Sequence, residues 1–357
     1  MYVKSLDLKN FRNYRSLSLQ FDPGVNIFYG NNAQGKTNIL EAVYLAGTTK
    51  SHRGTKDRDM IRMGEEESHL RMFLDRRGAE YRIDIHLKKN RPKGVAVNGM
   101  AVKRAADLYG IASLVFFSPE DLNIIKSGPA ARRKFIDQVL SGVDRLYLAD
   151  LVKYGRILNQ RNTLLHEAAF NEKRLAELDI WDMQLVSVGK KMIERRAAFL
   201  EDFSAAAAEK HLTLTEGKER LRISYEPNAA AEELELKTVR NRDMDLRTRE
   251  THAGPHRDDF QVRVNGMDLR IYGSQGQQRT AALSMKMAEI AVIEKMQGEK
   301  PVLLLDDVLS ELDTDRQNAL LKGIRDTQTM VTCTGLDDFV KDTFHADRIY
   351  HVNGNNN

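Results

Sequence analysis

Apolar and polar residues alternate along the first third of the chain, a pattern that is typical of half-buried β-strands. A more apolar stretch, "VNIFYG" at 25–30, leads into the helical pattern "TNILEAVYLAG" at 37–47. The stretches at 79–89 and 94–103 predict a hairpin. The stretches at 2–11 and 16–21 share the period of two, and "ASLVFFSPEDL" at 112–122 predicts another strand with a Ser-Pro stop.

The period changes between residues 121 and 215, where apolar residues recur at every third or fourth position. Residues 131–167 and 178–212 therefore predict two long amphipathic helices that pack as an antiparallel pair. The heptads are too few for an extended coiled coil. Strand patterns then return at 221–227 and 259–273.

A helical pattern follows up to about residue 297, and "PVLLLDDV" at 301–308 predicts a short buried strand. One more strand–helix unit and "DRIYHV" at 347–352 close the chain. The helical segment thus interrupts an α/β domain. We expect one lobe built from residues 1–120 and 216–357, with an inserted helical domain at 121–215.

Composition bounds the class of protein. The chain has 357 residues, of which 41% are hydrophobic, enough for a sizeable core and more than one lobe. Cys333 is the single cysteine, which excludes a disulfide framework and a cysteine-based zinc site. No apolar run approaches the roughly 18–20 residues of a membrane span, and the first residues already form a strand pattern. We therefore expect a soluble, cytoplasmic protein.

The formal net charge of +4 is mild, so it does not by itself predict a nucleic-acid partner. The distribution of charge is more informative, because basic residues gather in four short stretches. Together they could supply phosphate contacts, although each alone is better explained as an ordinary solvated face. These stretches are "KSHRGTKDR" at 50–58, "KKNRPK" at 88–93, "ARRK" at 131–134 and "KKMIERR" at 190–196.

The strongest motif is "GNNAQGKT" at 30–37, which fits the phosphate-binding P-loop pattern and stands between a predicted strand and a predicted helix. Gly30 and Gly35 let the backbone curl so that its N–H groups face an anion at the helix N-terminus. Lys36 is then placed to reach the β- and γ-phosphates, and the Thr37 hydroxyl to ligate Mg²⁺. A plain glycine turn is the weaker alternative.

Two carboxylates, Asp306 and Asp307, end the buried strand at 301–308. In P-loop proteins this position holds Mg²⁺, a role that falls to Asp306, while Asp307 would orient or activate the attacking water. A strand end that caps the next helix is the alternative. Some 270 residues separate the two motifs, which favours an ATPase interrupted by an inserted domain.

A second glycine-containing loop, "YGSQGQQRT" at 272–280, starts the helix that ends near residue 297. Ser274 and Gly276 offer a hydroxyl, free N–H groups and a close backbone approach. Locally this stretch is explained by an ordinary helix cap. Its position between the P-loop and the aspartate strand favours a phosphate-reading loop instead.

The ordered set "GNNAQGKT", "SQGQQ", "LLLDD" and "SELD" resembles the ABC-type ATPase heads of the SMC/Rad50-like family. In that family "SQGQQ" is similar to the signature, and Ser310 to Asp313 are similar to the D-loop. The stretches "NFRNY", "SHR", "FFSPEDL" and "GPHRDDF" resemble the branch that acts in bacterial recombinational DNA repair. The resemblance covers essentially the whole chain.

This resemblance implies an α/β P-loop ATPase head with an inserted α-helical domain, acting as a head-to-tail dimer that closes around ATP. Asp306 of one subunit would hold Mg²⁺, while Ser274, Gly276 and Gln277 of the other would reach the γ-phosphate. Arg12 matches an arginine that contacts nucleotide in related heads. The implied nucleotide-binding loop comprises Gly30, Asn31, Asn32, Ala33, Gln34, Gly35, Lys36 and Thr37.

The resemblance further implies DNA as a ligand and RecO and RecR as partners, with the recombinase RecA loaded at single-strand gaps and stalled forks. It implies a weak, DNA-stimulated ATPase that serves as a molecular switch in DNA repair, in replication and in the SOS response to damage.

Two positions depart from the wider ABC pattern. Glutamate is usual where this chain has Asp307, and the shorter side chain predicts slow turnover. The switch histidine is missing from "MVTCTG" at 330–335, which offers Thr332, Cys333 and Thr334. A transporter nucleotide-binding subunit is the alternative class, but it normally carries that histidine. An SMC-like structural tether would need a longer coiled coil.

"THAGPHRDD" at 251–259 has several explanations. His252 and His256 with Asp258 and Asp259 could form a metal site, but the intervening glycine and proline favour a turn before a strand. DNA contact is a further possibility. For His52 and Arg53 of "SHR", phosphate contact and structural packing are equally supported.

Overall fold

The computed structural model describes residues 1–102, 108, 110–168, 175–309, 314–324, 326–335 and 346–353. The chain forms two compact units, one from Met1–Asp121 and Glu289–Asn357, the other from Leu122–Ala288. The second unit continues well beyond residue 215, where the predicted helical insertion ends. The reason is that β9 (Leu221–Glu226) packs along helix α5 (Leu175–Leu214).

In the first unit, one sheet is antiparallel and has the strand order β2-β1-β4-β5-β6-β7. Its outer hairpin of β5 and β6 pairs Ile83 with Val97 and His86 with Gly94, which confirms the predicted hairpin. The strands are β1 (Tyr2–Phe11), β2 (Tyr14–Gln20), β4 (Glu67–Arg76), β5 (Ala79–Lys88), β6 (Gly94–Val97) and β7 (Met100–Ala101).

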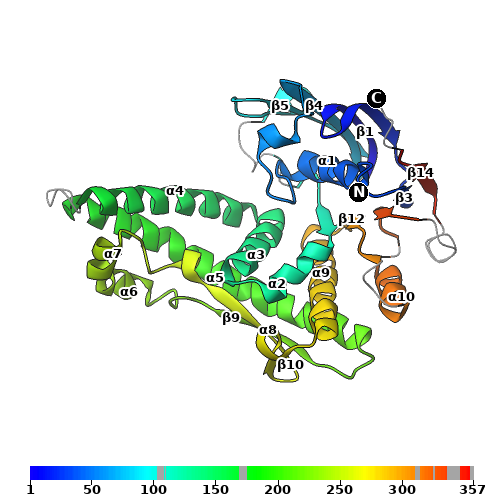
Figure 1. Cartoon of the computed structure of the whole chain (residues 1–357). Coiled ribbons are helices and arrows are strands. Elements are labelled where there is room, and N and C mark those ends of the chain that lie inside the picture. The colour runs from blue at the N-terminus through cyan, green and yellow to red at the C-terminus, as the bar shows by residue number, and fades with distance from the viewer. Residues whose placement is uncertain are drawn as a thin grey trace. The chain divides into compact units, whose positions relative to one another are not determined.

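The other sheet of this unit is parallel, in the order β14-β3-β13-β12-β8. Helix α1 (Lys36–Thr48) follows β3 and contacts strands of both sheets, which buries Ile39, Leu40 and Val43 in one shared core (Figure 1). The strands are β3 (Val25–Tyr29), β8 (Leu114–Phe117), β12 (Val302–Asp306), β13 (Thr329–Cys333) and β14 (Arg348–His351), with η1 (Asp57–Met60), η3 (Pro119–Leu122) and α10 (Thr314–Gly323) beside them.

The second unit is dominated by long helices. Residues 131–167 were predicted to form one helix, but the structure has two, α3 (Pro129–Val143) and α4 (Arg145–Ala168). The break lies at Asp144, whose side chain accepts hydrogen bonds from the N–H groups of Leu146 and Tyr147 and so caps a new helix. Helices α4 and α5 pack side by side, as the sequence predicted (Figure 1).

A small antiparallel sheet, β11-β10-β9, completes this unit. The predicted single strand at 259–273 is a hairpin of two strands, because the chain turns at Asn265 and Gly266, whose φ angles are 50° and 83°. Asp268 then accepts bonds from the N–H groups of Arg270 and Ile271 and starts a helical turn. The elements are α2 (Asn123–Lys126), α6 (Leu234–Arg240), α7 (Arg242–Thr248), η5 (Pro255–Arg257), β10 (Asp259–Val264), β11 (Met267–Asp268), α8 (Leu269–Tyr272) and α9 (Gln275–Gln297), of which α9 belongs to this unit up to Ala288. In the described part of the chain, no helix has the length and hydropathy needed to cross a bilayer.

Candidate functional site

The P-loop connects β3 to α1 at the carboxyl-terminal edge of the parallel sheet, the edge at which such sheets bind ligands. Gly35 precedes the helix without a side-chain cap, and the first turn of α1 contains no acidic residue. The N-terminal N–H groups of α1 therefore face the loop with their partial positive charge uncompensated, an arrangement that favours an anion.

Both glycines of the loop are required by its geometry. Gly30 and Gly35 have φ angles of 150° and 108°, in the left-handed half of the map that disfavours other residues. A Cβ at Gly30 would lie 2.3 Å from the carbonyl oxygen of Val352, and one at Gly35 would lie 2.5 Å from Asn13 Nδ2. Asn31, Asn32 and Ala33, between them, are exposed.

Lys36 is 8% exposed and folds back over the loop. Its Nζ donates hydrogen bonds to the carbonyl oxygens of Gly30 and Asn31, at 2.6 and 2.8 Å. Burial lowers the pKa of the Lys36 ammonium, although the charge of Asp307 opposes the shift. An anion bound in the loop would stabilise the charged form of Lys36 and so raise its pKa again.

The aspartate strand lies at the same edge. Thr37 Oγ1 donates to Asp306 Oδ1 at 2.7 Å, so the structure brings together the two side chains predicted to hold a metal ion. Hydroxyl and carboxylate oxygens are hard donors of the kind that Mg²⁺ prefers, and their separation is close to the roughly 3 Å between neighbouring ligands of an octahedral Mg²⁺. The site therefore fits that ion.

Thr332, on the intervening strand β13, links the two aspartates. Its Oγ1 donates to Asp306 Oδ1 at 2.8 Å and accepts the N–H of Asp307 at 3.0 Å. Asp307 has a φ of 53°, a left-handed conformation that is uncommon outside glycine and concentrates at functional sites. ABC-type ATPases usually carry a switch histidine after this strand, and this chain has none there. Thr332, on β13 itself, contacts both aspartates instead.

The loop between β1 and β2 supports the P-loop from outside, which the sequence did not reveal. Asn13 Nδ2 donates to the carbonyl oxygen of Gln34 at 3.0 Å, and Asn13 Oδ1 accepts from Asn38 Nδ2 at 2.8 Å. A single side chain thus ties the phosphate loop to Asn38 in the first turn of α1. Its signal in the sequence was only its place in "NFRNY".

The Arg12 side chain points toward α1 and forms an ion pair there, so its guanidinium is not free to bind a ligand. Its guanidinium makes two 2.8 Å hydrogen bonds to the carboxylate of Glu41, which is fully buried in α1 and also accepts from Ser51. Although burial opposes it, hydrogen bonds from Arg12 and Ser51 lower the pKa of Glu41. The nucleotide contact expected of Arg12 would require this ion pair to rearrange.

The stretch at 272–280 forms a capping box at the start of α9. The N–H of Gln277 donates to Ser274 Oγ at 3.2 Å, and the N–H of Ser274 donates to Gln277 Oε1 at 3.0 Å. Ser274 and Gly276 are exposed, and the first turn of α9 contains no acidic residue. The stretch is therefore a helix cap that leaves its hydroxyl proton and its N–H groups accessible to an anion.

Gln277 also joins the start of α9 to Glu219, which follows α5 in the same unit. Its Nε2 donates to Glu219 at 2.8 Å, and the same carboxylate lies 3.2 Å from His211 Nε2 at the end of α5. The opposite ring nitrogen of His211 is 2.9 Å from Ser284 Oγ on α9. These contacts fix the orientation of the exposed serine. The predicted D-loop, Ser310 to Asp313, lies outside the described residues.

The motif at 251–259 is structural. His256 is enclosed by Tyr154 and by the carbonyl oxygen of Thr251, each 2.8 to 2.9 Å from a ring nitrogen, and burial lowers its pKa to about 4. His252 pairs with Asp245 instead. The considered metal site with Asp258 and Asp259 is therefore wrong, and the predicted turn before a strand is confirmed.

The aspartates of this motif bind arginines from the helices. Asp258 is 1% exposed and lies 2.9 Å from Arg196, while Asp259 makes a two-pronged pair with Arg132 at 2.6 and 2.7 Å. Arg132 was one of the basic residues considered for phosphate contact, and so was Arg196. Both instead hold the strand β10 to α3 and α5.

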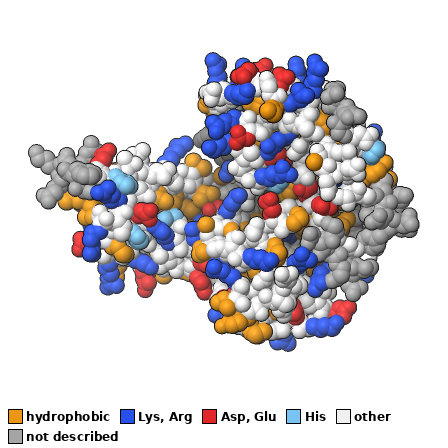
Figure 2. All heavy atoms as spheres, in the orientation of Figure 1, with side chains coloured by type: hydrophobic (Ala, Val, Ile, Leu, Met, Phe, Trp, Pro, Cys, Tyr) orange, Lys and Arg blue, Asp and Glu red, His pale blue; other side chains and the backbone are white. Residues whose placement is uncertain are grey.

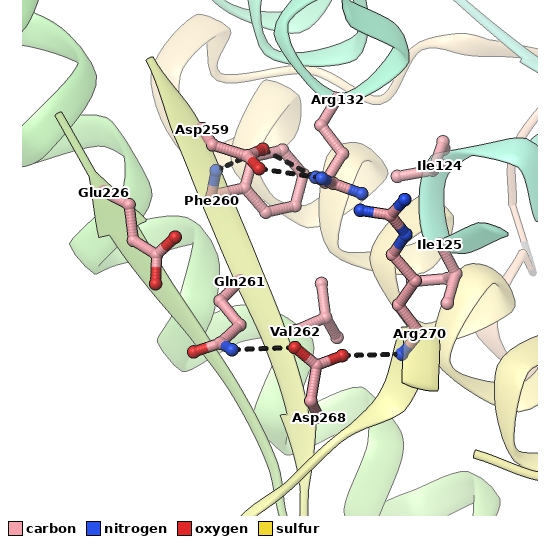
Figure 3. A pocket seen from close by; sticks show the side chains of 10 residues that line it. All are labelled: Ile124, Ile125, Arg132, Glu226, Asp259, Phe260, Gln261, Val262, Asp268 and Arg270. Carbon is pink, nitrogen blue, oxygen red and sulfur yellow. Dashed lines mark hydrogen bonds and ion pairs between the residues drawn. The ribbon is translucent and has the colours of Figure 1, made fainter. Parts of the chain in front are cut away.

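A pocket of about 200 Å³ lies beside this ion pair, between β10, α2, α3 and α8 (Figure 3). Arg132 and Asp259 close one side, and Gln261 and Asp268 form a hydrogen bond on the other. It contains no residue of the P-loop, of the aspartate strand or of the loop at 272–280. Its lining residues are Ile124, Ile125, Arg132, Glu226, Asp259, Phe260, Gln261, Val262, Asp268 and Arg270.

The basic stretches at 50–58 and 88–93 remain on the surface of the first unit. Lys93 Nζ binds the carbonyl oxygen of Thr49 and Asp57 Oδ1, at 2.6 and 2.9 Å, which joins the two stretches. Four cations of these stretches are exposed: Lys50, Arg53, Lys56 and Arg91. The His52 ring stacks on Phe116 with 3.8 Å between the ring centres, so His52 has a packing role. On the one face of the molecule that Figure 2 shows, basic side chains are interspersed with acidic ones.

A P-loop, an aspartate strand at the same sheet edge and an exposed serine loop at a helix start define the fold class as an ABC-type ATPase head. The family described as "RecF/RecN/SMC N terminal domain" matches residues 2–356. The chain is 53% identical over 352 residues to the DNA replication and repair protein RecF of Lachnoclostridium phytofermentans, covering 99% of this chain and 98% of that protein. It is 44% identical over 346 residues to RecF of Clostridium botulinum, covering 96% and 94%.

Solved structures agree. The chain matches a structure described as the recombination mediator protein RecF-ATPrS in the RecFOR pathway, with a TM-score of 0.92, 36% identity and coverage of 99% of this chain and 96% of that one. The Smc head of Pyrococcus furiosus shares the fold, with a TM-score of 0.55 at 18% identity over 98% and 92% of the two chains. The chain therefore belongs to the RecF/RecN/SMC family and, within it, to the RecF proteins.

Proposed function

We propose that this protein binds ATP and Mg²⁺ and uses them to close a head-to-tail homodimer on DNA during recombinational repair and replication. The observation that supports this proposal most directly is the group of Thr37, Asp306, Thr332 and Asp307 at one sheet edge, joined by hydrogen bonds of 2.7 to 3.0 Å, next to Lys36 of the P-loop. The match to RecF solved as RecF-ATP, at 38% identity, supports the nucleotide.

We assign these residues the following roles in the proposed reaction. The P-loop N–H groups bind the phosphates, and Lys36 turns from the carbonyl oxygens of Gly30 and Asn31 toward them. Thr37 and Asp306 hold Mg²⁺, which when bound neutralises charge that develops on the phosphate oxygens. Asp307, fixed by Thr332, orients the attacking water. Because its side chain is one methylene shorter than glutamate, we expect slow turnover, as in a switch.

The signature loop supplies the argument for a dimer. Ser274 and Gly276 are exposed, and the neighbouring Ile271 and Tyr272 are 68% and 70% exposed. Exposed large apolar side chains beside a helix N-terminus that can bind an anion are typical of a protein–protein interface. We propose that this surface contacts the γ-phosphate held by a second copy. Family membership favours this function over a transporter subunit.

The relatives are named for DNA replication and repair, and their solved structures for the RecFOR pathway. These names support, for this chain, the general role in repair and the proposed partners RecO, RecR and DNA. From the motif resemblance we further propose that the protein acts in the cytoplasm, in RecA loading at single-strand gaps and in the SOS response.

ATP-dependent association tests the proposal. We expect sedimentation velocity to show a larger species when ATP and Mg²⁺ are added to the wild type, and no such shift for Ser274→Arg, whose longer cation blocks the contact. Ser187→Arg, at an exposed serine on α5 in the same unit as Ser274, is the control for added charge. A wild type whose mass does not change with ATP, or a Ser274→Arg variant that dimerises normally, would exclude the dimer.

Thr332→Val is expected to lower ATP turnover about tenfold, while ATP affinity stays within about threefold of the wild type. Valine keeps the shape of a side chain that is 2% exposed but removes the bonds to Asp306 and to the N–H of Asp307. Loss of a bond to a charged group costs about 1.5–3 kcal/mol. Steady-state hydrolysis is the measurement. Thr332→Ser should recover most of the turnover, and unchanged turnover in the valine variant would remove Thr332 from the mechanism.

The joined basic stretches at 50–58 and 88–93 are the surface that we propose for DNA. Replacing Arg53 and Lys56 together by glutamine should lower the slope of log affinity for duplex DNA against log salt concentration by about 2, since each phosphate contact contributes about 0.9. The matched control replaces Lys153 and Arg156, exposed cations on α4. Equal slopes in the two double variants would place the DNA elsewhere.

A further inference from the structure

A cluster of imidazole and carboxylate groups lies on the outer face of the antiparallel sheet, and the proposed ATPase does not use it. Glu67 and His69 on β4 alternate with the buried Ser68 and Leu70, so both point outward. In register, His69 pairs with His86 of β5, and Glu67 pairs with Lys88. Side chains directly opposite on one face have Cβ atoms about 5 Å apart, which brings these groups within reach of one another.

The two imidazoles converge on one carboxylate. Glu67 Oε2 lies 3.1 Å from His86 Nε2, and Glu67 Oε1 lies 3.6 Å from His69 Nε2. The two rings stack with 4.0 Å between their centres and an angle of 19°. One ligand atom from each of the three residues can be chosen so that all lie within 4.8 Å of one another. Two bonded strands fix this spacing.

We propose that Glu67, His69 and His86 form a binding site for a divalent transition metal, with Zn²⁺ as the natural ligand. Neutral imidazole nitrogen is the donor that zinc and its neighbours prefer, and a carboxylate oxygen completes a His₂Glu set. Bond lengths of about 2.0–2.2 Å require the three atoms to approach to roughly 3.4 Å, which small side-chain rotations supply. The fourth tetrahedral position is left for water.

The charges around the cluster decide its strength. Hydrogen bonds from Lys88 and His86 lower the pKa of the Glu67 carboxyl to about 2, so the ligand is ionised at neutral pH. Lys88 Nζ lies 3.1 Å from Glu67 Oε2 and competes directly with a metal. Lys9 on β1 pairs in register with His69 and adds a second positive charge, while Arg71 and Asp84 compensate each other at 2.6 Å.

Bound zinc would cross-link β4 to β5 and stabilise the hairpin. The three ligands belong to no part of the proposed nucleotide site, whose donors are the hard oxygens of Thr37 and Asp306. Excess Mg²⁺ can therefore occupy those oxygens during a measurement without filling the His₂Glu cluster, because Mg²⁺ binds imidazole poorly. The proposal stands or falls independently of the proposed ATPase.

Isothermal titration of the full, chelator-treated chain with Zn²⁺, in excess Mg²⁺, tests it. We expect one zinc per chain in the wild type. His69→Gln and His86→Gln should each weaken binding by on the order of 100-fold, since even loss of an outer-shell partner costs 10–100-fold. His166→Gln, at an exposed histidine on α4, is the matched control and should bind as the wild type does.

Lys88→Ala distinguishes a metal site from a merely adjacent set of side chains. Removing the competing ammonium should tighten zinc binding roughly three- to tenfold, because one repulsive charge near a dication is lost. Cobalt(II) absorption of the tetrahedral type should appear with the same dependence on these variants. Zinc bound equally by the wild type and the His69→Gln/His86→Gln double variant would overturn the proposal, and so would weaker binding by Lys88→Ala.

Discussion

Replacing Lys36 by alanine is expected to weaken ATP binding by about 100-fold or more, the largest functional effect that we predict. Lys36 is 8% exposed, and its ammonium is held over the loop by the carbonyl oxygens of Gly30 and Asn31. A phosphate in the loop would meet a desolvated cation there. Truncating one partner of a buried, hydrogen-bonded charge pair costs about 2–5 kcal/mol. Equilibrium binding of a fluorescent ATP analogue is the measurement.

Two further variants separate binding from chemistry. Lys4→Ala removes a lysine that pairs with Glu80 on the surface, and it should leave ATP affinity unchanged. Asp307→Asn should keep ATP affinity while turnover falls, because the amide does not activate or orient water as the carboxylate does. ATP binding by Lys36→Ala within threefold of the wild type would show that the loop at 30–37 is not the phosphate site.

Replacing Arg196 by methionine is expected to lower the free energy of unfolding of the second unit by about 3–5 kcal/mol. Arg196 is 2% exposed and donates to Tyr147 Oη at 2.9 Å, to the carbonyl oxygen of Pro255 at 2.6 Å, and to Asp258 and Asp137 at 2.9 and 2.8 Å. Methionine fills much of the volume but leaves the buried Asp258 carboxylate without its cation. Urea denaturation followed by circular dichroism measures the shift.

The adjacent arginine provides the control. Arg195 makes its ion pairs with Asp150 and Asp144 near the surface, with 27% of its side chain exposed. Exposed pairs contribute about 0–1 kcal/mol, so Arg195→Met should shift the urea midpoint little. Similar losses in the two variants would mean that burial of the Arg196–Asp258 pair does not determine the stability of this unit.

The sequence predicted the parts of the site that are local. A P-loop needs glycines, a lysine and a threonine within eight consecutive residues, and its place between strand and helix shows in the hydrophobic pattern. The aspartate strand is similarly continuous. The strand and helix order of the α/β lobe followed from the same patterns. The helix break at Asp144 was missed, because apolar spacing continues through it while the cap depends on one side chain.

Contacts between distant segments could not be read in this way. Thr332 lies 26 positions from Asp306, and only parallel pairing of β12 with β13 brings their side chains together. Asn13 reaches Gln34 because the β1–β2 loop folds over the P-loop. The arginines at 132 and 196 looked like surface charges in sequence, since nothing local shows that Asp259 and Asp258 neutralise them.

The central claim is that each nucleotide site is completed by a second subunit, and mixing two defective variants tests it most directly. Lys36→Ala lacks the phosphate-binding lysine, and Ser274→Arg lacks the signature serine. In a head-to-tail dimer, one site of the mixed pair combines the intact Lys36 of one subunit with the intact Ser274 of the other. We predict that sedimentation velocity with ATP shows each variant alone as a monomer and the equimolar mixture as a dimer. A mixture that stays monomeric while the wild type dimerises would contradict a site shared between subunits.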